Sequence, residues 1–77
     1  MEDERMEMLR EFFALYRKLQ KDRTLRMQSH FDNYGQNYIE IWECKDHKRL
    51  KSICRAKEET EEACYKRAIG DLKRFIT

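Results

Sequence analysis

The spacing of apolar residues predicts a helix at each end of this chain and three strands between them. From residue 3 to 21, apolar side chains recur every three or four positions, and at ~100° per residue they share an arc of roughly 180°. They are Met6, Met8, Leu9, Phe12, Phe13, Leu15, Tyr16 and Leu19. This arc is wider than one sheet contact requires. Either this helix also packs on the second helix, or part of the arc is left for a partner.

The middle of the chain alternates with the period of two that strands show. In residues 24–31, Leu25 and Met27 point to one side, and polar residues between them point to the other. Two further strands are predicted at residues 37–44 and 49–56, each after a short segment rich in turn-forming residues. Short connections between consecutive strands favour an antiparallel meander.

The last predicted element is a helix over residues 58–75, with glutamates in its first turns, where the helix dipole favours negative charge. Its apolar stripe consists of Cys64, Tyr65, Ala68, Ile69, Leu72, Phe75 and Ile76. Seventy-seven residues are enough for one domain. We therefore predict a single compact α+β domain over residues 1–77, of order α-β-β-β-α, in which two helices cover one face of a three-stranded antiparallel sheet.

The two faces of this sheet can be assigned if Asp46 and His47 form the centre of an even-numbered hairpin loop. The face toward the helices then carries Ile39, Ile41, Leu50, Ser52 and Cys54. The opposite, open face carries Tyr38, Glu40, Trp42, Cys44, Lys51, Ile53 and Arg55, with Arg26, Gln28 and His30 from the first strand. An odd-numbered loop would shift the register and mix the two sets.

Positive charge is concentrated in the predicted strands. Residues 23–57 carry eight Lys and Arg against four Asp and Glu, whereas residues 1–22 and 58–77 each carry one more acid than base. Aromatic side chains beside cations are how sheet platforms hold single-stranded nucleic acid, although a cross-strand cation–π pair on an ordinary solvated face fits the same residues. The candidate binding residues are Trp42, Tyr38, Arg26, His30, Lys51 and Arg55.

The start of the last predicted helix reads Ala56-Lys57-Glu58-Glu59-Thr60-Glu61, followed by an apolar stripe with two alanines. With the helix, three strands, helix order, it resembles the double-stranded-RNA-binding domain, which opens this helix with Ser-Lys-Lys-x-Ala-Lys. Of those three lysines only Lys57 has a counterpart, and glutamates replace the other two. The contact with duplex phosphates that the resemblance implies is therefore lost. The size and layout are also similar to small αβ proteins carried by phages and other mobile elements.

No catalytic or metal-binding signature is found. The three cysteines are an odd number and evenly spaced, which argues against a disulfide framework and for reduced thiols. Cys44 and His47 have the spacing of a zinc knuckle, but Cys54 and Cys64 are predicted to face the core, so the four cannot close on one ion. Two glycines cannot form a phosphate loop. We predict a protein that is not an enzyme and has no metal or cofactor.

These patterns favour a small protein that works by binding. Protein–protein interaction is the leading hypothesis, and an inhibitor of a host nucleic-acid-targeting complex, encoded by a phage or mobile element, is its most specific version. The alternative is a nucleic-acid-binding module that uses the open face. A homodimer through the first helix is a further expectation. The acidic N-terminal residues do not resemble a signal peptide and no apolar run is long enough to span a membrane. We therefore expect the cytoplasm, that of the host if the protein is phage-encoded, and no membrane partner.

Overall fold

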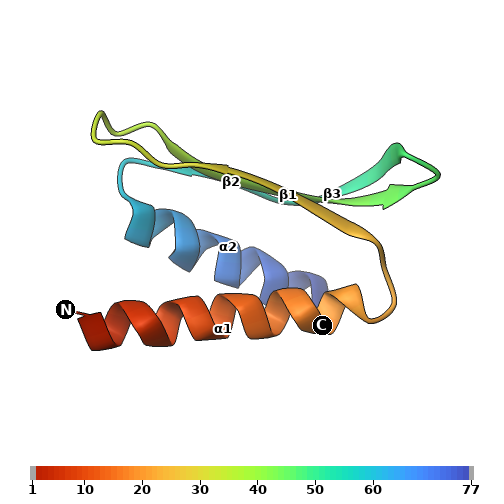
Figure 1. The fold of residues 1–77 in the computed structure, drawn as a ribbon, viewed down its shortest axis with the longest axis horizontal. Coiled ribbons are helices and arrows are strands. Elements are labelled where there is room, and N and C mark those ends of the chain that lie inside the picture. The colour runs from red at the N-terminus through yellow and green to blue at the C-terminus, as the bar shows by residue number, and fades with distance from the viewer. Residues whose placement is uncertain (1, 77) are drawn as a thin grey trace.

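The computed structural model describes residues 2–76, apart from the side chain of Glu2. It has the predicted element order and is an α+β domain with a three-stranded antiparallel sheet, so the predicted fold class is confirmed. The elements are α1 (Glu2–Gln20), β1 (Leu25–His30), β2 (Asn37–Lys45), β3 (Lys48–Glu58) and α2 (Glu61–Ile76). Figure 1 shows both helices on the same side of the sheet, with α2 next to the sheet and α1 farther from it. No helix among the described residues is long and apolar enough to cross a membrane.

Helix α2 begins later than the sequence predicts. The strand β3 continues to Glu58, so a helix start at residue 58 is wrong. Thr60 caps the helix instead, because its Oγ1 accepts a hydrogen bond from the Ala63 N–H at 3.1 Å. A capping hydroxyl of this kind satisfies one of the unpaired N–H groups in the first turn. Only Glu61 and Glu62 therefore lie in the first turn, where they suit the positive end of the helix dipole.

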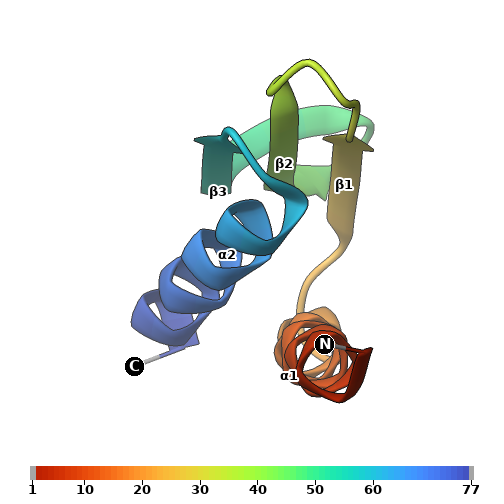
Figure 2. The same ribbon diagram turned by 90° about the vertical axis from the view of Figure 1, so that its left-hand side faces the viewer.

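The two helices have different relations to the sheet. Helix α2 packs directly on β3 and β2, whereas α1 packs mainly on α2. Viewed along α1, α2 lies below β3 and α1 lies below β1 (Figure 2). Part of the wide apolar arc of α1 is therefore used against α2, as one of the two sequence-based alternatives proposed. Another part remains exposed at Met6 and Phe13.

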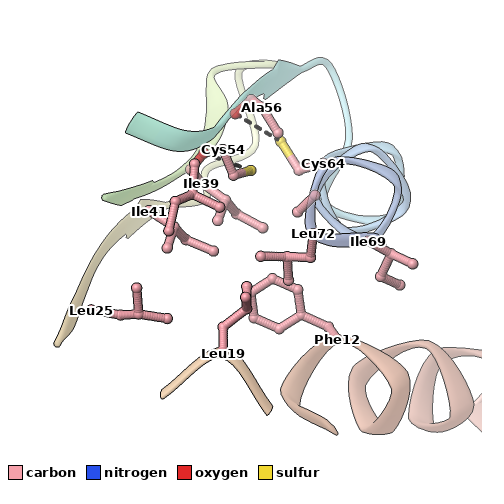
Figure 3. Packing of buried hydrophobic residues seen from close by; sticks show 12 residues of the cluster. Phe12, Leu19, Leu25, Ile39, Ile41, Cys54, Ala56, Cys64, Ile69 and Leu72 are labelled. Atoms are coloured by element: carbon pink, nitrogen blue, oxygen red, sulfur yellow. Dashed lines mark hydrogen bonds between the residues drawn. The ribbon is translucent and has the colours of Figure 1, made fainter. Parts of the chain in front are cut away.

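The hydrophobic core lies between the sheet and the two helices. Phe12 of α1 and Leu72 of α2 point toward Ile39 and Ile41 of β2 in the close view of Figure 3, and all four are buried. The prediction that Leu72 and Ile41 are fully buried is confirmed. The complete buried cluster is Phe12, Leu19, Leu25, Ile39, Ile41, Ile53, Cys54, Ala56, Cys64, Ala68, Ile69 and Leu72.

The loop between β2 and β3 is a two-residue turn formed by Asp46 and His47. Lys45 pairs with Lys48, and both Asp46 (φ 53°) and His47 (φ 65°) adopt the positive φ that a type I′ hairpin turn requires. Residues with short polar side chains or imidazole tolerate this region better than most. The even-numbered loop assumed for assigning the faces is therefore present.

Two bulges in β3 nevertheless change the predicted faces. Ile41 pairs with Cys54, but Trp42 pairs with Ser52, so Ile53 is an extra residue; a second irregularity makes Leu50 extra. Each extra residue shifts the side-chain alternation by one position. Ile53, predicted on the open face, is buried, whereas Leu50, predicted in the core, is 57% exposed. Ser52, also predicted in the core, is exposed beside Trp42.

Candidate functional site: the open face of the sheet

The face of the sheet opposite the helices is the candidate functional site. Because directly paired residues of antiparallel strands point to the same side, the register defines three rows across this face. We call this surface the open face; its rows are His30–Tyr38–Lys57, Gln28–Glu40–Arg55 and Arg26–Trp42–Ser52, and Arg49 and Cys44 extend it toward the β2–β3 turn. Both helices lie on the other side of the sheet (Figure 1).

The indole of Trp42 is half-buried beneath an arginine. The guanidinium carbon of Arg49 lies 4.2 Å from the centroid of the Trp42 ring, a close cation–π contact. Sequence reasoning did not include Arg49 among the site residues. The two-residue turn does indicate that Arg49 belongs to this face. It pairs Arg49 with Cys44, and Arg49 then lies diagonal to Trp42 across the hairpin.

A single carboxylate pairs with two of the three arginines of the open face. Glu40 Oε1 lies 3.1 Å from Arg49 Nη2, and its Oε2 lies 3.4 Å from Arg55 Nε. Glu40 is at the centre of the middle strand and is partly buried. Because one acceptor holds both guanidinium groups, their positions are set before any ligand binds, although each exposed ion pair adds little to stability.

The opposite end of the open face is formed by a histidine–tyrosine pair. The rings of His30 and Tyr38 stack with their centroids 5.8 Å apart and their planes at 21°. His30 Nε2 donates to the Asp32 carboxylate at 3.0 Å, and the N–H groups of Tyr34 and Gln36 donate to its other oxygen. The hydrogen bond from His30, followed by those from the two backbone amides, lowers the pKa of Asp32 below its usual value. The carboxylate thereby fixes both the β1–β2 loop and the imidazole.

Five of the six predicted site residues, Trp42, Tyr38, Arg26, His30 and Arg55, come together on the open face. Lys51 does not, and its assignment to this face is wrong. The bulge at Ile53 makes Lys51 pair with Glu43 on the helix side, where its Nζ lies 4.9 Å from the centroid of the Phe75 ring of α2. Lys57 contributes a positive charge to the open face instead, because it pairs with Tyr38.

The open face is basic, but its aromatic rings are already in contact with neighbouring groups. It carries four bases, Arg26, Arg49, Arg55 and Lys57, against the single acid Glu40. One side of Trp42 is covered by Arg49, and Tyr38 stacks on His30. A nucleic-acid base would have to displace these groups before it could stack on those ring faces. The arrangement therefore presents cations more readily than aromatic planes.

The thiols belong to the core rather than to this site. Cys54 and Cys64 are buried, as predicted, and Cys64 Sγ donates to the carbonyl of Asn37 at 3.1 Å. Figure 3 shows both thiols directed into the space between β3 and α2. Burial, with a smaller contribution from the charge of Asp71, raises the pKa of Cys54 to about 12. Within residues 2–76 no group of three or more His, Cys, Asp or Glu side chains is arranged to hold a metal ion.

We expect the three thiols to differ in reactivity in the folded protein. Cys44, which is half-buried, should react first with a maleimide at neutral pH, while Cys54 and Cys64 should resist labelling because thiolate formation is suppressed and access is blocked. Mass spectrometry of the labelled protein over time measures the order. In denaturant all three should label at similar rates. Labelling of native Cys54 as fast as Cys44 would contradict the core assignment.

Comparisons of the chain with protein-family models, with curated protein sequences and with solved structures found no match. The interpretation of the open face therefore rests on the geometry and chemistry of this chain's own side chains.

Proposed function

We propose that this chain is a non-enzymatic binding domain whose open face binds an acidic surface of another protein. The observation that carries the proposal is the arrangement of Arg49 and Arg55, both held by Glu40, with Arg49 lying on Trp42. Arginine and tryptophan are the residues enriched at the energetic centres of protein interfaces. Side chains that are already ordered lose less conformational entropy on binding.

The same geometry supports a protein partner over nucleic acid. Glu40 places a negative charge at the centre of the surface that a phosphate backbone would have to cross, and the ring of Trp42 is covered by Arg49. Two glutamates near the start of α2 also oppose duplex RNA. Glu61, in its first turn, is paired with Arg5 at 2.7 Å, and Glu58, the last residue of β3, is paired with Arg67 at 2.8 Å. These acids stand where the resemblance to the RNA-binding domain would require lysines that contact phosphates.

A phage-encoded inhibitor of a host nucleic-acid-targeting complex is the most specific member of this class that we propose. A protein that blocks such a complex would act in the host cytoplasm. The support from this chain is its small size and the basic surface on one side of the sheet. The binding partner would then be an acidic region of that complex rather than its nucleic acid.

The proposal is tested by capture experiments with the tagged full-length protein in lysate of its native host. Trp42→Ala should lower the free energy of unfolding by only about 1 kcal/mol or less, since it loses a surface cation–π contact. It should nevertheless abolish capture of the partner, because truncation of a central aromatic anchor often costs ~2 kcal/mol or more of binding energy. Thermal melting and quantitative mass spectrometry of captured proteins measure the two effects.

Charge variants provide the matched control. Arg55→Ala, on the open face, should weaken capture, with an effect that decreases at high salt, whereas Lys51→Ala, on the helix side, should leave capture unchanged. Capture should survive nuclease treatment. Normal capture by Trp42→Ala would overturn the proposed site. Binding to single-stranded oligonucleotides at ~150 mM salt with a steep salt dependence would instead support the nucleic-acid alternative.

A further inference from the structure

The four bases of the open face differ in whether they already have an acidic partner. Arg49 Nη2 and Arg55 Nε lie 3.1 and 3.4 Å from the two carboxylate oxygens of Glu40. Arg26 and Lys57 have no ion pair within residues 2–76. These two bases stand at opposite corners of the open face, because they lie on opposite edge strands and in its two outer rows. The open face therefore has two unpaired cations at its corners and two paired ones beside its central acid.

Glu40 stands between these cations and remains accessible from solution. It lies in the middle row of the middle strand, and its side chain keeps 21% of its surface exposed. With Arg55 and Lys57 it lines a hollow on the open face. An anion that approached either paired arginine would therefore come within a few ångströms of the Glu40 carboxylate, and like charges at such distances repel each other.

This arrangement treats a nucleic-acid backbone and a protein surface differently. Proteins that hold single strands use a positively charged groove that follows the backbone and neutralises successive phosphates. The open face offers no such path, because its central position is an acid. A protein surface can instead place separate carboxylates over Arg26 and Lys57 and a hydrogen-bond donor over Glu40, whereas a phosphodiester group offers only acceptor oxygens.

We propose that Glu40 is the specificity-determining residue of the open face: it excludes a continuous phosphate backbone and restricts the face to the separate carboxylates of a protein ligand. Removal of its charge should release Arg49 and Arg55 and join all four bases into one cationic surface. This inference rests on the proposed function, because it takes the open face as the binding surface. Its test uses no partner protein, so the two proposals can fail separately.

Glu40→Gln tests the proposal, since it removes the charge and keeps the size and an acceptor oxygen. The probe is a fluorescein-labelled oligothymidylate of about 20 nucleotides, and fluorescence anisotropy measures its affinity for the full-length protein between ~50 and ~200 mM salt. The slope of log K against log salt should be steeper by about 1.4, because each phosphate neutralised on a single strand contributes ~0.7 and two arginines are released. At ~50 mM salt these two contacts should make binding at least about tenfold tighter than in the unsubstituted protein.

Glu43→Gln is the matched control, because it makes the same substitution and the same change of net charge on the same strand. Glu43 pairs with Leu25 and Lys51 on the helix side, and its carboxylate lies 3.9 Å from Arg23. The affinity and the slope of this variant should stay close to those of the unsubstituted protein. Equal gains by both variants would reduce the effect to net charge and overturn the proposal. Tight binding by the unsubstituted protein, with a slope as steep as that of Glu40→Gln, would overturn it as well.

A double variant identifies which cations the oligonucleotide contacts. Glu40→Gln combined with Arg55→Ala should lose about half of the gain in slope, ~0.7, because one of the two released guanidinium groups is gone. A slope as steep as that of Glu40→Gln alone would show that the released Arg55 is not a contact and would contradict the proposal. Circular dichroism confirms that each variant is folded. Loss of partner capture by Trp42→Ala together with no gain by Glu40→Gln would leave the proposed function standing and remove this inference.

Discussion

Leu72→Ala is expected to lower the free energy of unfolding by about 2–5 kcal/mol, the range for removing a fully buried leucine side chain. Leu72 has no exposed surface and lies among the core residues of α1 and β2 in Figure 3. A domain of this size has only ~5–10 kcal/mol of stability in total. The loss is a large fraction of that total, so the melting temperature should fall by about 8 °C or more. Urea denaturation followed by circular dichroism measures the change.

Leu50→Ala is the matched control for this experiment, because it makes the same substitution at a leucine that is 57% exposed. It should change the free energy of unfolding by less than ~0.5 kcal/mol, as is usual for surface positions. The pair also tests the bulges of β3, since a regular ladder would place Leu50 in the core. Equal destabilisation by the two substitutions would contradict the observed register.

Asn37→Ala is expected to lower the free energy of unfolding by about 2–4 kcal/mol, because it leaves two polar backbone groups without partners. Asn37 is 3% exposed and joins two loops. Its Oδ1 accepts a hydrogen bond from the Asp32 N–H at 3.0 Å, and its Nδ2 donates to the Glu59 carbonyl at 2.8 Å. The side chain thus ties the β1–β2 loop to the segment that leads into α2. Thermal and urea unfolding measure the loss.

Asn33→Ala, in the same loop, is the matched control, because Asn33 is exposed. Its free energy of unfolding should be within ~0.5 kcal/mol of that of the unsubstituted protein. Asn37→Asp separates the two hydrogen bonds, since an aspartate keeps the acceptor and loses the donor to Glu59. The free energy of unfolding of Asn37→Asp should also be lower than that of the unsubstituted protein, because the aspartate places a charge at a buried position. Unchanged stability of Asn37→Ala would show that this polar bridge is not structural.

The candidate site could be predicted from the sequence only in part. Tyr38, Glu40 and Trp42 alternate along one strand, so their common face follows from the period of two. Arg55 was placed correctly beside them because both bulges lie between it and the turn and their two shifts cancel. Lys51 lies between the bulges, where one shift remains, and it was therefore assigned to the wrong face. The cation–π contact between Arg49 and Trp42 depends on side-chain conformations, which a pattern of residue types does not contain.

The sequence by itself determined the order of elements, the position of the turn at Asp46–His47 and the burial of Ile41 and Leu72, because periodicity and turn preference act between near neighbours in the chain. Only the tertiary structure decided where β3 bulges, that Asn37 is buried with its amide satisfied, and that α1 packs on α2 and leaves Phe13 partly exposed. These features depend on the fit between surfaces distant in sequence. A strand bulges where regular pairing would bury a poorly fitting residue, and a polar side chain is buried where distant loops supply its partners.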